Sequence, residues 1–480
     1  MDIILKNQTL VSALEDEKSY LLERQKHTRY QIVGQPKRFR RILIEGAAFI
    51  ISADAKNKVQ VLPDHSIYIV DGVIKEVYRG HKKNKIPQSR IDVIYDGGKR
   101  SGIVVTPGFI NAHAHPPMYL LRSSMTLDKG NIVDQVQKMA ELEAQMQADD
   151  FFLGAVGDFT EEQKTGITTT LSHYAVFDAI EKAARMTRQN VINAFSVISN
   201  SHPGNCPAMM AKILKNRKKY FTQPAIAIHY LHRASPEQLR QIKALIKKYN
   251  ILFTMHAAET DVWVQECVNK FGKRTVEALV DLGLASSNVL LSHAVHLSEE
   301  EIKLVKKYKI GIVHLPTSNK IHKSGEFKYP LFVRHGAENR IALGTDSVIS
   351  KNSLDLLSEA LQMRIMHQDT QLVYYEELFK MMTSQAAEIL KLGKVGRILP
   401  GYRADLAFWK LRDRGFMPYN EKKPVSLIGN MITHGGRNVR DLMINGEFVI
   451  TNRLHNLINE SKLMTELQQV HMELRKRLKE

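Results

Sequence analysis

Between residues 104 and 392, short apolar segments alternate with helix-compatible stretches eight times over. The segments are VVTPGFINAH, GITTTLSHY, VINAFSVI, AIAIHYL, ILFTMHAAE, NVLLSHAVHL, KIGIVHLP and RIALGTDS. Two intervening stretches open with a capping-box pattern, Ser235 with Gln238 and Ser298 with Glu301, which is typical of helix starts. Eight strands with a helix after each are what a (β/α)8 TIM barrel requires, so the expected class is α/β. The chemistry of such a barrel lies at the carboxyl ends of its strands.

Strand-like sequence flanks this region on both sides. ILIEGAAFII and SIYIVDGVIKEVY precede it, while ADLAFWK and DLMINGEFVI follow it. Asp71-Gly72 and Asn445-Gly446 are pairs that favour a two-residue hairpin turn. We therefore expect a small β-sandwich domain built from N- and C-terminal segments.

The expected domain boundaries follow from these changes in sequence pattern. One helical face near the C-terminus carries Leu463, Leu467, Val470, Leu474 and Leu478, and should pack on the body or on a partner subunit. The expected parts are an N-terminal extension over 1–40, sandwich segments over 41–107 and 397–455, the barrel over 108–396 and a C-terminal amphipathic helix over 456–480.

Composition restricts the setting in which this chain works. Hydrophobic residues make up 44% and charged residues 25%, which is ordinary for a globular protein. Two cysteines cannot form a disulfide framework, and no apolar run reaches the roughly 18 residues of a membrane span. We expect a cytoplasmic protein without a membrane partner. The formal net charge of +18 is spread along the chain, yet it leaves open a catalytically silent barrel that binds nucleic acid.

Ionisable side chains collect at the ends of the predicted strands. His113 and His115 end the first strand with a two-residue spacing that places both imidazoles on one face. Later strand ends carry His229, His256 with Glu259, His293 and Asp346. Three imidazoles and one carboxylate suit Zn²⁺ with an open position for water, and Fe²⁺ or Mn²⁺ would tolerate the same donors. Glu259 follows His256 by three residues, so it can move a proton beside the metal.

PGFINAHAH, MHAAE, LSHAVHL, HLPTSN and ALGTDS resemble, in order, the signatures of the amidohydrolase superfamily. The resemblance extends from about residue 41 to 450 and is nearest to the mononuclear zinc deaminases and chlorohydrolases. These include S-adenosylhomocysteine/adenosine deaminases, guanine deaminases and s-triazine hydrolases. The resemblance implies one metal ion, because AIAIHYL lacks the strand-four lysine of the binuclear members.

The resemblance also implies roles for single residues. The implied metal ligands are His113, His115, His256 and Asp346. Glu259 would be the proton shuttle, His293 would orient the attacking water or polarise the leaving group, and Asp346 would also accept the proton of that water. The implied or expected substrate contacts are His229, Glu143, His202 and His314.

The walls of the pocket depart from each branch of the family. Guanine deaminases resemble one another in an Arg-Phe pair at the end of strand four, whereas this chain has His229-Tyr230 there. The strand-four loop, HYLHRAS, also lacks the Pro-Tyr pair that is usual in the family. AFSVISNSHPGNCPA has no clear counterpart of the arginines that hold the nucleoside part in S-adenosylhomocysteine deaminases. We expect a deaminase that replaces an exocyclic amine on a nitrogen heterocycle, and the alternative is an s-triazine hydrolase that displaces halide or alkylamine. The expected partners are this small molecule and further copies of the chain in a dimer or tetramer.

Overall fold

The computed structural model describes residues 30–33, 39–80, 86–98, 102–124, 132–351, 353–434 and 439–477. Most of the predicted N-terminal extension, and Leu478 of the predicted apolar face, lie outside these residues. Among the described helices, none is both long and apolar enough to cross a lipid bilayer.

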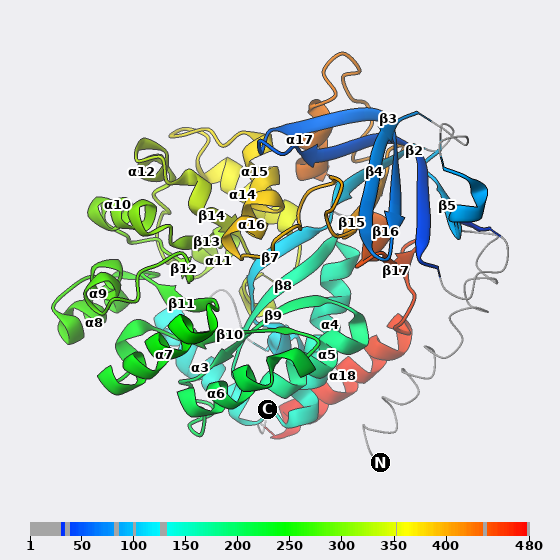
Figure 1. Ribbon diagram of the computed structural model, residues 1–480. Helices are drawn as coiled ribbons and strands as arrows, with labels where there is room; N and C mark the ends of the chain where they lie inside the picture. Colours follow the sequence, from blue (N-terminus) through cyan, green and yellow to red (C-terminus); the bar gives the residue numbers. More distant parts are fainter. Residues whose placement is uncertain are drawn as a thin grey trace.

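Within the described residues, eight parallel strands form the barrel sheet, each paired with the next strand along the chain (Figure 1). They are β7 (Phe109–Ala114), β8 (Ile167–Tyr174), β9 (Asn190–Ser196), β10 (Gln223–Ile228), β11 (Phe253–Ala257), β12 (Val289–His293), β13 (Gly311–His314) and β14 (Ile341–Leu343). A parallel bridge between Ala114 and Asp346 brings the last strand beside the first, so the predicted (β/α)8 class is confirmed.

Helices connect these strands and surround the barrel (Figure 1). The connecting helices are α3 (Ile132–Ala144), α4 (Ala148–Lys164), α5 (Phe177–Thr187), α6 (Pro207–Lys215), α7 (Pro236–Tyr249), α8 (Asp261–Phe271), α9 (Thr275–Asp281), α10 (Glu299–Tyr308), α11 (Pro316–Ile321), α12 (Tyr329–Arg334), α13 (Val348–Lys351), α14 (Leu356–Met366), α15 (Tyr375–Met381) and α16 (Ser384–Ile389). Both predicted capping boxes are present, with Ser235 accepting from the amide of Gln238 and Ser298 from that of Glu301. Local side-chain chemistry therefore sets these helix starts.

A second, mixed sheet joins the two ends of the chain (Figure 1). Its strands are β1 (Tyr30–Ile32), β2 (Arg41–Ala53), β3 (Val59–Val70), β4 (Val73–Arg79), β5 (Val93–Asp96), β6 (Ile103–Pro107), β15 (Leu406–Lys410), β16 (Val439–Ile444), β17 (Glu447–Thr451) and β18 (Leu454–His455). Asp71-Gly72 and Asn445-Gly446 both have positive φ at the turns of their hairpins, as predicted. Strand β6 pairs with β15 from the far end of the chain, so both ends build one β unit.

The predicted first strand VVTPGFINAH is in fact two strands in two sheets. Strand β6 belongs to the mixed sheet and β7 to the barrel, and they meet at Gly108. A Cβ at Gly108 would collide with the side chain of Thr168, so only glycine allows this close passage between the sheets. The chain thus enters the barrel at a fixed point, five residues before His113.

The C-terminal helix α18 (Glu460–Arg477) packs on the barrel. This is the first of the two predicted alternatives, packing on the body or on a partner subunit. Its buried face shares a core with α4 and with the 3₁₀ helix η3 (Pro116–Leu121). The residues of that face are Leu463, Leu467, Val470 and Leu474. Because η3 directly follows His115, α18 supports the segment that leaves the predicted metal site.

Candidate active site

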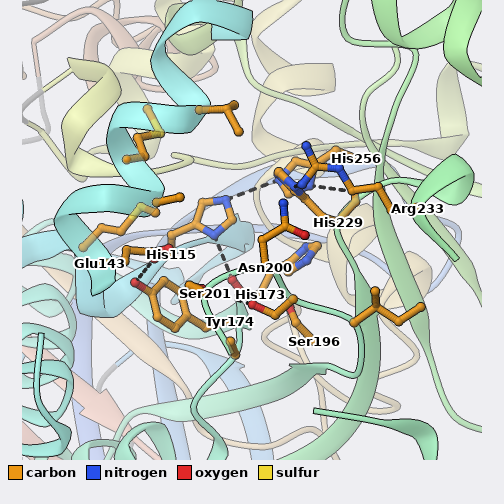
Figure 2. Close-up of a pocket in the computed structure, with 17 residues that line it drawn as sticks. His115, Glu143, His173, Tyr174, Ser196, Asn200, Ser201, His229, Arg233 and His256 are labelled. Atoms are coloured by element: carbon orange, nitrogen blue, oxygen red, sulfur yellow. Dashed lines mark hydrogen bonds between the residues drawn. The ribbon is translucent and has the colours of Figure 1, made fainter. Parts of the chain in front are cut away.

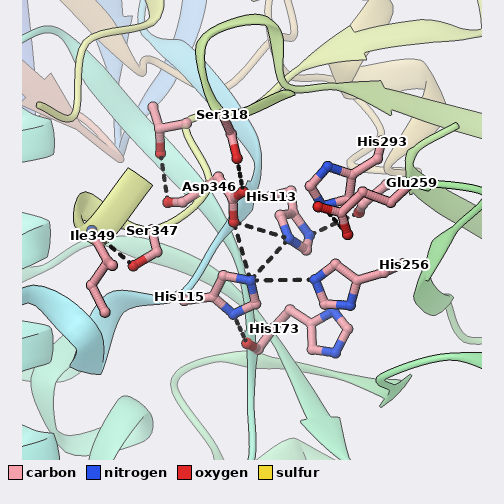
Figure 3. A network of polar contacts seen from close by, with 12 residues as sticks. His113, His115, His173, His256, Glu259, His293, Ser318, Asp346, Ser347 and Ile349 are labelled. Atoms are coloured by element: carbon pink, nitrogen blue, oxygen red, sulfur yellow. Dashed lines mark hydrogen bonds and ion pairs between the residues drawn. The ribbon is translucent and has the colours of Figure 1, made fainter. Parts of the chain in front are cut away.

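The predicted metal ligands meet at the carboxyl end of the barrel (Figure 3). His113 lies in β7 and His256 in β11, while His115 and Asp346 follow β7 and β14. His113 is fully buried, and His256 and Asp346 are nearly so. Residues separated by up to 233 positions in the sequence therefore share one small, dry volume, as the barrel topology requires.

Three imidazole nitrogens face one another in this volume. Nε2 of His115 lies 3.1 Å from Nε2 of His113 and 3.4 Å from Nε2 of His256. Nδ1 of His115 donates to the carbonyl of His173 (2.8 Å), and Nδ1 of His256 donates to that of His229 (3.1 Å). A carbonyl can only accept, so a neutral ring at either position directs an Nε2 lone pair inward.

Asp346 completes the group as its carboxylate. Its Oδ1 lies 3.3 Å from Nε2 of His115 and 3.8 Å from Nε2 of His113, while Ser318 donates to its Oδ2 at 2.5 Å. Ligands about 2.0–2.2 Å from a tetrahedral zinc ion would stand roughly 3.3–3.6 Å apart. The observed spacings and the inward lone pairs thus fit one divalent metal ion.

The titration of these groups agrees with a cation site. Burial holds the pKa values of His113 and His256 well below the usual range, so both rings are neutral. Burial would raise the pKa of Asp346, but its bond to His115 and the nearby histidines hold it well below the usual range. Burial would lower the pKa of His115, yet its bond to Asp346 raises it instead. Binding of a cation here would therefore compete with protonation of His115.

Left-handed backbone conformations gather around this group. Ala258, His293, Ala294 and Asp346 all have φ between 46° and 69°, which residues other than glycine rarely adopt. Asn111 stabilises the last of these corners, because its Oδ1 accepts from the amide of Thr345 (3.0 Å). Its Nδ2 donates to the hydroxyl of Thr345 (2.7 Å) and to the carboxyl group of Glu162 (2.5 Å). Such strain persists where surrounding contacts impose it, as at functional sites.

Glu259 lies beside the metal group without joining it (Figure 3). Its Oε2 accepts from the hydroxyl of Tyr230 (2.8 Å) and lies 3.6 Å from Nε2 of His293. The hydroxyl of Ser324 is 3.4 Å from Oε1. Burial raises the pKa of Glu259, and only partial compensation comes from its neighbours. A buried carboxyl group in this position can both take and give a proton.

His293 lies close to both Glu259 and the metal group. Its Nδ1 lies 2.8 Å from Oδ1 of Asn319, which accepts and so assigns the Nδ1 proton. Its ring is 5.4 Å from that of His256 and 6.2 Å from that of His113. Nε2 of His293, 3.6 Å from Oε2 of Glu259, faces that carboxyl group.

A cavity of about 130 Å³ opens from this group toward α3 and the loop after β9 (Figure 2). Two of the predicted substrate contacts, His229 and Glu143, lie in its wall. The hydroxyl of Tyr174 donates to the Glu143 carboxylate, while Arg233 donates to His229. Burial raises the pKa of Glu143, and the Tyr174 and Ser201 hydroxyl groups oppose this shift. The remaining wall is largely neutral and includes Met118, Val136, Met139, Ile198, Ser199, Asn200 and Ser201.

The other two predicted substrate contacts do not line this cavity. His202 packs its ring against Phe151 (5.5 Å between centroids), and its Nδ1 lies 3.1 Å from the hydroxyl of Ser201. His314 is fully buried and stacks on Phe327 with centroids 4.1 Å apart. It points into the packing between barrel and outer helices rather than toward the metal group.

Several residues at the site were missed by the sequence reasoning about metal and substrate. Tyr230 and Ser324 support Glu259, and Ser292 lies 2.9 Å from Nδ1 of His113. A ring nitrogen of His173 lies within 4.8 Å of those of His113 and His256, so this imidazole belongs to the same cluster. His173 was not missed, because its position in SHY at a predicted strand end marks it as a residue that could line the pocket, and it does line the cavity.

Comparisons with known proteins agree with this geometry. The model of the amidohydrolase family matches residues 104–449. A 5-methylthioadenosine/S-adenosylhomocysteine deaminase of Pyrococcus furiosus is 30% identical over 418 residues, covering 84% of this chain and 95% of that protein. The enzyme of the same name from Syntrophomonas wolfei is 29% identical, with 85% and 94% covered.

Solved structures share the fold at lower sequence identity. An adenosine deaminase from Xanthomonas campestris with bound zinc superposes with a TM-score of 0.80 at 22% identity, covering 92% of this chain and all of that one. The atrazine chlorohydrolase of Arthrobacter aurescens with zinc gives 0.78 at 20%, with 90% and 100% covered. Together, the family match, the relatives and the assembled ligand set show that this chain belongs to the amidohydrolase family.

Proposed function

We propose that this protein is a zinc-dependent deaminase of adenosine-type nucleosides, which exchanges the amine on the purine ring for oxygen and releases ammonia. The observation that carries the proposal is the buried Glu259, held by Tyr230 beside a complete metal-ligand group. A barrel that only bound a ligand would have no chemical use for this proton carrier.

The residues that would hold the metal are His113, His115, His256 and Asp346. When bound, the ion supplies a water molecule whose pKa is lowered toward about 7, and hence a nucleophile at neutral pH. The side chains proposed for the remaining proton transfers are Glu259 and Asp346.

Glu259 would deliver a proton to the ring nitrogen next to the reacting carbon. Protonation of that nitrogen allows the carbon to accept water, because the electrons of the C=N bond move onto the nitrogen. Asp346 would accept the proton that the water loses, because its ionised carboxylate lies beside His113 and His115. Asp346 would pass this proton on to the exocyclic nitrogen, which leaves as ammonia when the C–N bond breaks. The hydroxyl group on the ring carbon would lose its proton to Glu259 and become the carbonyl of the product. His293 would orient the water.

The far end of the cavity supports a nucleoside rather than a bare base. Glu143 presents a carboxylate there, and its bond to Tyr174 leaves it further capacity to accept hydrogen bonds from sugar hydroxyl groups. Met118 and Met139 offer apolar surface along the same wall. Relatives named for 5-methylthioadenosine and S-adenosylhomocysteine point to the same class of substrate.

The test is ammonia release by zinc-loaded enzyme from adenosine, 5-methylthioadenosine, S-adenosylhomocysteine, guanine and an aminotriazine. Glu259→Gln serves as the matched variant because it preserves the shape and leaves the metal ligands intact. We expect ammonia from at least one nucleoside with wild-type enzyme, and none with a variant that still binds one zinc ion. Activity confined to guanine or the triazine would contradict the nucleoside assignment, and metal loss in the variant would contradict the role of Glu259.

A further inference from the structure

Arg233 and His229 form a directed pair in the wall of the active-site cavity (Figure 2). Nη1 of Arg233 lies 2.9 Å from Nδ1 of His229. A guanidinium group has donors and no acceptor, so Nδ1 of His229 must accept this hydrogen bond. The imidazole is then neutral and carries its single proton on Nε2.

The other surroundings of the Arg233 guanidinium group do not explain its position. Arg233 ends the 3₁₀ turn η5 (Leu231–Arg233), and its guanidinium carbon lies 5.5 Å from the centre of the Tyr230 ring. Among the described residues, no carboxylate forms an ion pair with it, although the side chain is only partly exposed. Partial burial of an unpaired cation costs free energy, so the contact with His229 calls for a functional explanation.

The backbone of His229 is held from the opposite side. Its carbonyl accepts from both the amide (3.0 Å) and the Nδ1 (3.1 Å) of His256. The two rings stand edge to face, with their centres 4.9 Å apart. Hydrogen bonds from His256 to its carbonyl therefore hold the backbone of His229 in place. The hydrogen bond from Arg233 fixes which ring nitrogen of His229 carries the proton.

We propose that Arg233 is a positioning residue that locks His229 in the Nε2-protonated tautomer, so that the cavity presents a permanent N–H donor to an unprotonated ring nitrogen of the substrate. This inference rests on the proposed function, because a purine has such acceptors at N3 and N7 beyond the nitrogen assigned to Glu259. A ring with C–H at the recognised position leaves the donor unpaired and is rejected, as in other sites built around a fixed donor.

Steady-state kinetics with ring-edited substrates test this role. Arg233→Met and Arg233→Lys are compared with wild type on adenosine, 3-deazaadenosine and 7-deazaadenosine, with Arg240→Met on the exposed face of α7 as the control. We expect Arg233→Met to lose roughly tenfold in kcat/KM on adenosine, mainly through KM, as one lost hydrogen bond predicts. The loss should vanish on the analogue that lacks the recognised nitrogen, and Arg233→Lys should recover most of it. Metal content should stay unchanged.

Two kinetic outcomes would overturn the inference. An equal loss on adenosine and on both deaza analogues would make Arg233 a merely structural residue. A loss in kcat/KM that is larger on S-adenosylhomocysteine, whose 5′ substituent is charged, than on 5-methylthioadenosine, whose 5′ substituent is neutral, would mean that Arg233 contacts the substrate itself.

The tautomer can be measured even if none of these purines is turned over. Long-range ¹H–¹⁵N correlation of protein with ¹⁵N-labelled histidine assigns His229 as the signal lost in His229→Asn. We expect an unprotonated Nδ1 and a protonated Nε2 in wild type, and a mixture of tautomers in Arg233→Met. A protonated Nδ1 in wild type would overturn the inference, whereas absence of deamination alone would overturn only the proposed function.

Discussion

Tyr230→Phe removes a single hydroxyl group from the support of Glu259. The Tyr230 hydroxyl donates to Oε2 of Glu259 at 2.8 Å, and both side chains are at most 3% exposed. The next polar neighbours of the carboxyl group, Ser324 and His293, lie at 3.4 and 3.6 Å. Phenylalanine keeps the ring that packs on Trp263, so the change is confined to this hydrogen bond.

The structure gives the sign and the size of the effect. Burial already raises the pKa of Glu259, and the Tyr230 hydroxyl opposes that rise because it stabilises the carboxylate form. A hydrogen bond to a charged group is worth about 1.5–3 kcal/mol. Loss of this bond should therefore destabilise the carboxylate by about that amount and raise the pKa of Glu259 further.

The assay is the pH dependence of kcat/KM for metal-loaded wild type, Tyr230→Phe and Tyr174→Phe. Tyr174 is the matched control, because it makes the same kind of buried bond to a different carboxylate, that of Glu143. We expect the limb that reports Glu259 to move to higher pH in Tyr230→Phe only, while Tyr174→Phe changes mainly KM. An unmoved limb, a shift to lower pH or an equal shift in both variants would refute this assignment of the proton carrier.

Three further changes test other parts of the account. His113→Ala should lose bound metal and activity together, as measured by elemental analysis beside turnover, and full metal retention would exclude His113 as a ligand. Burial raises the pKa of Glu162 to about 8, above its unfolded value of 4.5, so the native state binds this proton more tightly. Stability of wild type should therefore fall as pH rises from about 5 toward 8 relative to Glu162→Gln; a difference in Tm that does not change with pH would contradict this. Leu463→Ala, at a fully buried position of α18, should cost about 2–5 kcal/mol in urea unfolding, and a loss below about 1 kcal/mol would argue against that packing.

The parts of the fold that could be predicted are those governed by local sequence. The pairs at Asp71 and Asn445 tolerate positive φ wherever they occur, and Ser235 and Ser298 cap helices through residues three positions away. The position of His113 at the end of a strand could be predicted because it also depends on local sequence. The barrel then followed from the count and order of segments, since parallel strands need helical crossovers.

Contacts between distant loops could not be read from the sequence. Strand β10 ends at Ile228, whereas AIAIHYL predicted strand through Leu231. The early break into η5 is what places Tyr230 against Glu259, and the pattern of apolar residues contains no signal for it. His314 satisfies the same strand-end pattern as His293, yet its ring stacks on Phe327. Which way a strand-end side chain turns depends on the loops that pack around it.

The domain boundaries, the roles of the individual site residues and the dimer or tetramer stay predictions. The small cavity beside the metal group, about 130 Å³, favours a small-molecule substrate over an extended nucleic acid.

We propose that one metal ion and Glu259 together make this cavity the active site of a deaminase. Zinc should be titrated into metal-free wild type and Glu259→Gln while both bound metal and ammonia released from 5-methylthioadenosine and adenosine are recorded. We expect both proteins to bind one ion per chain, wild-type turnover to rise in proportion to bound metal, and the variant to release no ammonia. Ammonia release without metal, or undiminished turnover by Glu259→Gln, would contradict it.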